Sequence, residues 1–338
     1  MNIREAIENL VNRRNLSEAE TTDVMNQIMT GEATPLQVAS FLTALRMKGE
    51  TVDEITGAAK VMRAKAHRVK VGGKTVLDTC GTGGDQKGTF NISTTAAFVV
   101  AGAGVDVAKH GNRSVSSQSG SADVLGALGV KVDAPRERVE QCIAEIGIGF
   151  LFAPLLHEAM KYAVQPRRDI GIRTVFNLLG PLTNPATATH QLLGLYSGEL
   201  VALVAHVLKN LGSARAMAVH GMEGLDEISL CGPTKVAELR DGAVKEYTIE
   251  PEEFGLKRCP LSDLNGGSAQ QSAGIVLSVL DGVKGPTRDV ILLNSGAALY
   301  VAGRAATIKD GMAVAAESID SGKARQKLDR LVALTNAA

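Results

Sequence analysis

The apolar residues of the first 66 positions recur at helical spacing, so helices alone are predicted there. The apolar face of the first predicted helix consists of Ile3, Ile7, Leu10 and Val11. Further helix starts carry capping signals, which are Ser17 with Glu20, Thr34 with Pro35, and Thr51 with Glu54. Short helices before any strand predict a small helical domain, and apolar helix faces of this kind often support dimers.

From about residue 74, short apolar runs flanked by glycine alternate with helical stretches. The predicted strands are Thr75–Asp78, Val105–Lys109, Gly149–Phe152, Gln191–Tyr196 and Ala214–His220. The predicted helices between them include Ser93–Ala103, Pro135–Ile146 and Gly198–Leu211. This alternation predicts a largely parallel sheet covered by helices. The Asp241-Gly242 turn predicts a β-hairpin over Thr234–Glu250, and the tail from Ser268 is predicted to be helical.

The predicted fold class is therefore α/β, with a small N-terminal helical domain and a larger α/β domain that has a mostly parallel central sheet. The 338 residues exceed the usual size of a single core, which also favours two domains. We place the helical domain at residues 1–70 and the α/β domain at residues 71–338. A later segment near residues 160–185 is expected to pack on the helical domain.

Composition narrows the function classes. Lys and Arg number 36, as do Asp and Glu, so the formal net charge is zero, whereas a dedicated nucleic-acid binder normally carries a basic excess. Aromatic residues make up 3% of the chain and Trp is absent, so side chains that could stack on bases are scarce. A hydrophobic fraction of 45% is too high for a disordered protein. We expect no nucleic-acid partner.

The cysteines indicate a reducing compartment. Cys80, Cys142, Cys231 and Cys259 are scattered without a CxxC pair, which argues against a disulfide framework and a structural zinc site. The N-terminal segment lacks an apolar signal core, and no run approaches the roughly 18 apolar residues that a membrane span requires. We therefore expect a cytoplasmic protein with no membrane partner.

A glycine-rich loop follows the first predicted strand. The strand ends at Asp78, and the segment Cys80–Asp85 contains Gly81, Gly83 and Gly84. Glycine lets the backbone approach a ligand closely, and the next helix begins near Ser93, where its N-terminus favours phosphate. The loop matches neither a Walker motif nor a GxGxxG fingerprint. Phosphate binding is the favoured interpretation, and a glycine-rich turn with Ser/Thr capping is the alternative.

A second polar loop follows the next predicted strand. The segment Lys109–Ser117 and the adjoining Gly120–Asp123 supply two cations, an amide and several hydroxyls. Ligands of open α/β sheets bind beyond the carboxyl ends of the strands, and such side chains can neutralise a pyrophosphate. A solvated polar loop is the alternative. Two such loops from consecutive strands favour anion binding.

Two further clusters supply charges of both signs. The adjacent carboxylates of Asp226 and Glu227 follow the predicted strand Ala214–His220 and could share Mg²⁺ ions, although acidic pairs are also common on surfaces. Arginines occur at Arg167, Arg168 and Arg173, and an arginine near a polar cleft suits bidentate binding of a substrate carboxylate. A surface charge cluster remains the alternative for at least one of them.

Together, the strings KHGNRSVSS from Lys109 and RTVFNLLGPLTNP from Arg173 resemble the anthranilate phosphoribosyltransferases of tryptophan biosynthesis. The resemblance covers nearly the whole chain. It implies a fold similar to the nucleoside phosphorylases and class 3 phosphoribosyltransferases, and a homodimer formed through the helical domain. It also implies a Mg²⁺-dependent glycosyltransferase, with two ions expected per subunit. The implied reaction joins 5-phosphoribosyl 1-pyrophosphate to the amine of anthranilate, giving N-(5-phosphoribosyl)anthranilate and pyrophosphate, the second step from chorismate to tryptophan.

Positions are carried over from this resemblance one by one. The implied phosphoribosyl pyrophosphate site comprises Gly81, Gly84, Asp85, Thr89, Asn91, Ile92, Ser93, Thr94, Lys109, His110, Gly111, Asn112, Arg113, Ser114, Val115, Ser116, Ser117 and Ser121. The implied anthranilate site comprises Gly81, His110, Asn112 and Arg167, with Arg167 on the carboxylate. Ser93, Asp226 and Glu227 would bind the metal, and the catalytic residues would be Lys109, Asp226 and Glu227. This chain departs from the family at Gln86, usually Gly, and at Glu158, usually Pro.

The implied chemistry needs little proton transfer, because the proton of the aromatic amine can leave after attack. Charge stabilisation of the leaving group and positioning of two substrates would dominate. The nearest alternative is a pyrimidine-nucleoside phosphorylase, which would need its own phosphate and base motifs. A non-catalytic relative that binds nucleic acid is a second alternative, and it should show a basic surface and lost metal carboxylates.

Overall fold

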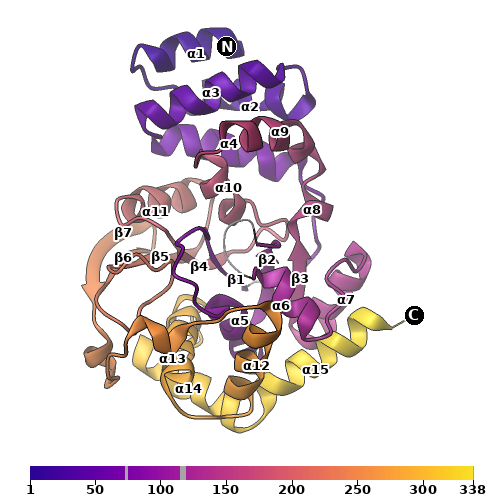
Figure 1. Cartoon of the computed structure of the whole chain (residues 1–338), viewed down its shortest axis with the longest axis vertical. Helices are drawn as coiled ribbons and strands as arrows, with labels where there is room; N and C mark the ends of the chain where they lie inside the picture. Colours follow the sequence, from indigo (N-terminus) through magenta and orange to yellow (C-terminus); the bar gives the residue numbers. More distant parts are fainter. Residues whose placement is uncertain (73–74, 115–118, 338) are drawn as a thin grey trace.

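The computed structural model describes residues 1–72, 75–114 and 119–337, and it shows a helical bundle at one end of an α/β domain (Figure 1). The bundle begins with α1 (Ile3–Val11), α2 (Glu18–Thr30), α3 (Pro35–Lys48) and α4 (Val52–Lys65). Each of these helices starts at a capping box, formed by Asn2 with Glu5, Ser17 with Glu20, Thr34 with Gln37, and Thr51 with Glu54. The predicted N-terminal helices and their starts are confirmed.

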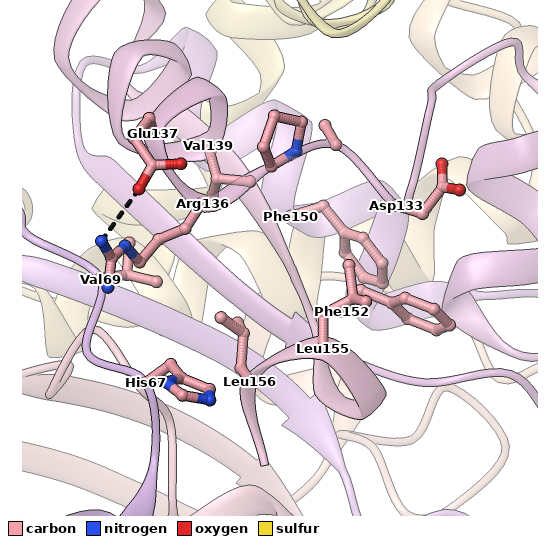
Figure 2. A pocket seen from close by; sticks show the side chains of 12 residues that line it. His67, Val69, Asp133, Arg136, Glu137, Val139, Phe150, Phe152, Leu155 and Leu156 are labelled. Carbon is pink, nitrogen blue, oxygen red and sulfur yellow. Dashed lines mark hydrogen bonds and ion pairs between the residues drawn. The ribbon is translucent and has the colours of Figure 1, made fainter. Parts of the chain in front are cut away.

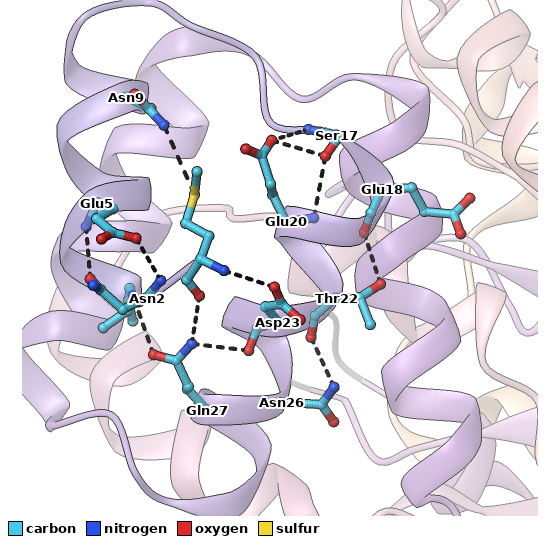
Figure 3. A network of polar contacts seen from close by, with 12 residues as sticks. Asn2, Glu5, Asn9, Ser17, Glu18, Glu20, Thr22, Asp23, Asn26 and Gln27 are labelled. Carbon is cyan, nitrogen blue, oxygen red and sulfur yellow. Dashed lines mark hydrogen bonds and ion pairs between the residues drawn. The ribbon is translucent and has the colours of Figure 1, made fainter.

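A polar network joins the first two helices of the bundle (Figure 3). The Met1 amino group forms an ion pair with Asp23 at 2.8 Å. The Gln27 side chain accepts a hydrogen bond from the Ile3 N–H at 3.0 Å and donates one to the Met1 carbonyl at 3.0 Å. Beneath the network, Val24 is fully buried, so the polar contacts lie over an apolar core.

Within the described residues, one seven-stranded sheet has the order β3-β2-β1-β4-β5-β6-β7. The strands are β1 (Val76–Gly81), β2 (Asp106–Gly111), β3 (Ile148–Phe152), β4 (His190–Gly194), β5 (Arg215–Gly221), β6 (Thr234–Arg240) and β7 (Ala243–Ile249). Neighbours from β3 to β5 pair in parallel, whereas β6 and β7 are antiparallel. This arrangement confirms the mostly parallel sheet and the hairpin predicted from the sequence.

Helices cover both faces of the sheet (Figure 1). The remaining α-helices are α5 (Ile92–Gly102), α6 (Ser121–Ala127), α7 (Arg136–Ile146), α8 (Ala153–Leu156), α9 (Lys161–Ile170), α10 (Phe176–Leu182), α11 (Leu200–Asn210), α12 (Ala269–Leu280), α13 (Pro286–Val301), α14 (Ile308–Asp320) and α15 (Lys323–Asn336). Short 3₁₀ helices occupy Glu158–Met160, Pro251–Phe254 and Leu261–Leu264. The side chains of α5 and α13 share one core with β2 and β5, and those of α11 share a second core with β4 and the bundle.

The bundle and the α/β domain are joined by side chains as well as by the chain. Helix α9 packs against α3 and α2, although it lies more than 100 residues later in the sequence. The half-buried Arg63 guanidinium of α4 donates to the Leu182 carbonyl at 2.8 Å and to the Leu211 carbonyl at 3.1 Å. It thereby caps the ends of α10 and α11, where unpaired carbonyls favour a cation.

Between β3 and β4, the sequence patterns predicted no particular helix or strand. Residues 153–182 contain α8, α9 and α10, and two of these helices include an internal proline, Pro166 and Pro181.

Among the described residues, no helix has both the length and the apolar character needed to cross a membrane.

Candidate active site

The carboxyl ends of β1, β2 and β5 bring the sequence-predicted loops together. The strand order reverses at β1, which pairs with β2 on one side and with β4 on the other. Helix α5, which follows β1, covers one face of the sheet, whereas α11, which follows β4, covers the other. A crevice at such a reversal is where open α/β sheets bind ligands.

Glycines at the carboxyl ends of β1 and β4 allow a close approach of Asp226. A Cβ atom at Gly81 would overlap the Asp226 carboxylate, and one at Gly194 would overlap the Asp226 backbone carbonyl. The Asp226 Oδ2 atom accepts a hydrogen bond from the Gly83 N–H at 2.7 Å. The acidic pair is therefore fixed directly beneath the glycine-rich loop.

The glycine-rich loop presents backbone N–H groups. Gly83, Gly84 and Gln86 have φ angles of 67°, 73° and 59°, a left-handed conformation that glycine adopts easily and Gln86 adopts at a cost. Within the described residues, the N–H groups of Gly84, Asp85 and Gln86 have no hydrogen-bond acceptor. Successive unpaired N–H groups in such a turn form a concave site for an anion.

Lys109 is the buried cation of the site. Its side chain at the end of β2 is 4% exposed, and its Nζ atom donates to the Thr79 carbonyl at 2.6 Å and to Ser93 Oγ at 3.3 Å. Burial lowers the pKa of Lys109, and the nearby charge of Asp78 opposes that change. The lysine thus lies between strand β1 and the first turn of α5.

Asp226 and Glu227 form a buried acidic pair. Burial raises the pKa of Asp226 to about 7, with a further contribution from Asp85. Burial and the neighbouring Asp226 raise the pKa of Glu227 to about 8. Glu227 Oε1 accepts from the Ser93 N–H at 3.0 Å, and the buried Asp85 Oδ2 has no partner within the described residues. Two neighbouring buried carboxyl groups are costly to ionise together, and a cation bound between them would stabilise both negative charges.

These residues fit Mg²⁺. The described residues contain no group of three or more acidic, histidine or cysteine side chains arranged to hold a metal ion by themselves. Mg²⁺ is usually bound by one or two carboxylates together with waters and substrate phosphates, so Asp226, Glu227 and the Ser93 hydroxyl suffice.

Asp78 and Asn184 support the site, and sequence reasoning gave them no role. The fully buried Asp78 accepts from the His110 N–H at 3.2 Å and from Asn184 Nδ2 at 2.8 Å. Burial raises the pKa of Asp78 to about 6. The Asn184 amide also donates to the Ala108 carbonyl at 2.8 Å, which ties the segment after α10 to β2. The available signal was the position of Asp78 at the end of the predicted strand, which the structure extends to Gly81.

Two buried histidines lie side by side at this edge. The rings of His110 and His157 are 5.1 Å apart, and the Nε2 atom of each has no partner within the described residues. Burial lowers the pKa of His110 to about 3 and that of His157 to about 4, so both rings are neutral at pH 7.

Arg167 has the environment expected of a carboxylate receptor. Its guanidinium lies 5.1 Å from the centre of the Phe176 ring, and in the described part of the chain it has no ion pair or hydrogen bond. Burial alone lowers the pKa of Arg167, so the group is partly desolvated without a counter-charge. An unpaired, half-buried guanidinium favours a bidentate anionic partner.

The other predicted residues vary in their placement. Asn91, Ile92 and Thr94 lie at the start of α5, Thr89 precedes them, and Ser121 Oγ donates to the Asn112 carbonyl at 3.2 Å. Gly111 ends β2, and the Ser114 N–H donates to Asp123 at 3.0 Å. The exposed Arg113 forms an ion pair with Asp123 at 3.1 Å. Val115, Ser116 and Ser117 lie outside the described residues.

The described residues also enclose a cavity away from these groups. A pocket of about 350 Å³ lies at the outer edge of β3, lined by Phe150, Phe152, Leu155, His67 and Arg136, among others (Figure 2). No predicted site residue lines it. Arg136 there pairs with Glu137 at 2.9 Å, and His67 pairs with Glu158 at 3.6 Å. The buried charges and unpaired N–H groups at the carboxyl edge of β1 identify the better candidate site.

The fold and site together define a glycosyltransferase. The model for the glycosyl transferase family a/b domain matches residues 73–325, and the model for the helical bundle domain of that family matches residues 4–66. The chain belongs to this glycosyl transferase family.

Within that class, the chain belongs to the anthranilate phosphoribosyltransferase family. It is 56% identical over 348 residues to the anthranilate phosphoribosyltransferase of Geotalea uraniireducens strain Rf4, with 99% of each chain covered. The crystal structure of the Thermus thermophilus enzyme superposes with a TM-score of 0.93 at 46% identity, covering 98% of this chain and 99% of that chain.

The yeast enzyme has been solved with ligands. The Saccharomyces cerevisiae anthranilate phosphoribosyltransferase in complex with PRPP and Mg has a TM-score of 0.90 at 31% identity, covering 99% of this chain and 98% of that chain. The same yeast enzyme in complex with 4-fluoroanthranilate has a TM-score of 0.88 at 29% identity, with the same coverage.

Proposed function

We propose that this enzyme transfers the phosphoribosyl group of 5-phosphoribosyl 1-pyrophosphate to the amine of anthranilate, with release of pyrophosphate. This reaction is the second step from chorismate to tryptophan. One observation carries the proposal: two buried carboxylates and a buried lysine lie at the end of β1, beside a loop in which the N–H groups of Gly84, Asp85 and Gln86 have no acceptors within the described residues. The full-length similarity to the Geotalea and yeast enzymes supports it.

The residue roles follow from charge. When the ribose C1–O bond breaks, negative charge develops on the pyrophosphate, and Lys109 together with the N–H groups of Gly84 and Asp85 would stabilise it. Bound Mg²⁺ supplies Lewis-acid stabilisation of the same oxygens, and Asp226, Glu227 and Ser93 would hold it, with two ions expected per subunit.

Anthranilate would bind beside the neutral histidines. The unpaired Arg167 would bind its carboxylate, and Gly81, His110 and Asn112 would line the rest of its site. His110 is held neutral because burial lowers its pKa, so it would orient the amine rather than carry a positive charge. The amine proton can leave after attack, which agrees with a neutral imidazole at this position.

The phosphoribosyl pyrophosphate site is proposed as the full set of positions carried over from the family: Gly81, Gly84, Asp85, Thr89, Asn91, Ile92, Ser93, Thr94, Lys109, His110, Gly111, Asn112, Arg113, Ser114, Val115, Ser116, Ser117 and Ser121. We also propose residues 1–70 and 71–338 as the two domains, with residues 160–185 packing on the first. The ranges of the two family models and the contact of α9 with α3 support this division. The scattered cysteines support a cytoplasmic location.

A homodimer through the helical domain is supported by two exposed apolar side chains on one face of α3. Leu36 is 77% exposed and Met47 is 69% exposed, and the half-exposed Ser40 and Thr43 lie between them. These positions are spaced by four, three and four residues, which places them on one helix face. Sedimentation of the protein should give a dimer, and the substitution Met47→Glu should shift it towards monomer, whereas a wild-type monomer would contradict the proposal.

The direct test of the function uses the fluorescence of anthranilate. Anthranilate, phosphoribosyl pyrophosphate and Mg²⁺ are mixed with the protein, and the signal should fall only when every component is present. Phosphorolysis of thymidine or uridine is the matched control. Phosphorolysis without loss of anthranilate would contradict the proposal and favour a nucleoside phosphorylase.

A further inference from the structure

We propose that Arg173 is a positioning residue, which holds the glycine-rich loop so that its N–H groups face the pyrophosphate. The inference rests on the proposed function, because it concerns how the leaving group is bound. Arg173 lies between α9 and α10, far in sequence from the loop that it contacts.

Two contacts fix the Arg173 guanidinium. It donates a hydrogen bond to the Gly84 carbonyl. Its Cζ atom also lies 4.3 Å from the centre of the Tyr196 ring, within the range of a cation–π interaction. Among the described residues, Arg173 has no ion pair with a carboxylate, so these contacts decide where the guanidinium lies.

The contact with Gly84 determines which way the next N–H group points. A peptide unit is planar and trans, so its C=O and N–H bonds point in opposite directions. Because Arg173 holds the Gly84 carbonyl on one side, the N–H of Asp85 is directed to the other side. That N–H has no acceptor in the described part of the chain, as expected of a group that awaits an anion.

The Tyr196 platform is tied to the same loop. The Tyr196 N–H donates to Thr82 Oγ1 at 3.1 Å, and the Thr82 N–H donates to the Gly194 carbonyl at 2.9 Å. The Gly83 N–H is bound from below by Asp226. The loop is therefore held at two neighbouring residues, at Gly83 by the Asp226 carboxylate and at Gly84 by an arginine that also contacts an aromatic ring.

The closing experiment compares Arg173→Ala with Arg168→Ala. Arg168 is an exposed cation on α9 whose side chain has no hydrogen bond or ion pair in the described residues, so it controls for the loss of one positive charge. We expect Arg173→Ala to raise the KM for phosphoribosyl pyrophosphate about tenfold and to change the KM for anthranilate less than about threefold, which corresponds to one lost hydrogen bond to a partly buried group. Arg168→Ala should leave both values unchanged.

Two further variants address the platform and the fold. Tyr196→Phe keeps the ring and should behave as wild type, whereas Tyr196→Leu should raise the same KM by a smaller factor, about threefold. Arg173→Lys keeps the charge but not the planar fork, so it should recover only part of the loss. Equal increases in both KM values for Arg173→Ala, or the same increase for Arg168→Ala, would overturn the inference.

Direct binding separates this inference from the proposed function. Calorimetry with Mg²⁺ and inorganic pyrophosphate should show about tenfold weaker binding to Arg173→Ala than to wild type, whether or not the protein turns over anthranilate. A wild-type protein that binds pyrophosphate but leaves anthranilate unchanged would contradict the function alone. Unchanged pyrophosphate binding by Arg173→Ala would contradict the role of Arg173.

Discussion

The helical bundle and the carboxyl edge of the sheet both bury a glutamate, and they treat it differently. In the bundle, Glu54 is fully buried and accepts hydrogen bonds from Leu16 N–H at 2.9 Å, Thr51 N–H at 2.8 Å and Lys48 Nζ at 2.9 Å. At the sheet edge, Glu227 lies beside Asp226, and its pKa is raised to about 8. The charge of Glu54 is balanced by Lys48 within the bundle, whereas Glu227 has no cation paired with it in the described residues and can bind one from solution.

The difference separates stability from function. Groups that are satisfied inside the protein stabilise the fold, whereas groups left unsatisfied are destabilising and persist where a ligand completes them. By this criterion the unpaired Arg167 and the unpaired N–H groups near Gly84 in the described chain belong with Asp226 and Glu227. The predictions below test that division, from the largest expected effect to the smallest.

The largest effect is expected at the acidic pair. Glu227→Gln should lower kcat/KM about a thousandfold or more, because the metal would lose one of its proposed charged ligands. The same substitution should not lower the melting temperature, since it replaces a buried carboxyl group that is costly to ionise beside Asp226 by a neutral amide of similar size. Fluorescence kinetics and calorimetry measure the two quantities, and a variant that melts well below wild type while keeping its activity would reverse the assignment.

The bundle glutamate should show the opposite behaviour. Glu54→Gln should destabilise the protein by about 3 kcal/mol, because Lys48 is left buried without its counter-charge. At a temperature where the variant is folded, its kcat should match wild type. Urea unfolding gives the first quantity, and a stability loss below about 1 kcal/mol would show that the pair is dispensable.

Arg167 should affect one substrate. Arg167→Ala should raise the KM for anthranilate about thirtyfold, the effect of losing a charged bidentate contact of about 2 kcal/mol. The KM for phosphoribosyl pyrophosphate should stay within about twofold of wild type, since the proposed contacts of that substrate are to the glycine-rich loop and Lys109. Equal increases for the two substrates would remove Arg167 from the anthranilate site.

The buried histidines should make the fold sensitive to acid. The pKa of His157 is lowered from 6.5 to about 4 in the folded protein. Between these two pH values the imidazole is protonated in the unfolded chain and neutral in the folded protein. Stability is then fully present above pH 6.5 and is lost as the pH falls towards 4. When the pH falls from about 7 to about 5, the free energy of unfolding of His157→Gln, measured in urea, should decrease by about 2 kcal/mol less than that of wild type. Parallel pH profiles for the two proteins would contradict this reasoning.

The smallest effect is expected at Gln86. Its φ of 59° is strained for a residue with a side chain, so Gln86→Gly removes about 1 kcal/mol of strain. Glycine also adds freedom to the unfolded chain, which offsets most of that gain. The melting temperature should therefore change little, and the KM for phosphoribosyl pyrophosphate should rise no more than about threefold as the loop is less fixed. A decrease of about tenfold would show that Gln86 obstructs the site.

Local patterns in the sequence were sufficient for most of the fold. The capping boxes at Ser17 and Thr51, the strand–helix alternation and the Asp241-Gly242 hairpin depend on near neighbours, and the structure confirms them. Helices α9 and α10 were not predicted because Pro166 and Pro181 lie inside them, and proline normally ends a helix. There the packing against the bundle outweighs the local preference.

The supporting residues of the site could not be predicted in this way. Asp78 and Asn184 form a hydrogen bond across 106 positions, and Arg173 contacts Gly84 across 89. Nothing in a single sequence relates positions so far apart, because the relation is created by the order of strands in the sheet. The charged residues themselves were visible from their types and their places at strand ends, and the family resemblance supplied their roles.

The close approach of Gly194 and Asp226 limits how this gene can vary. A side chain at position 194 would overlap the Asp226 carbonyl, so even alanine must displace the acidic pair of Asp226 and Glu227. In a library of all single substitutions selected for growth without tryptophan, we expect every codon change away from glycine at 194 to be lost. Glycine turns with open space, such as Gly212, should accept asparagine. The geometry of the site therefore depends partly on the absence of a side chain at Gly194.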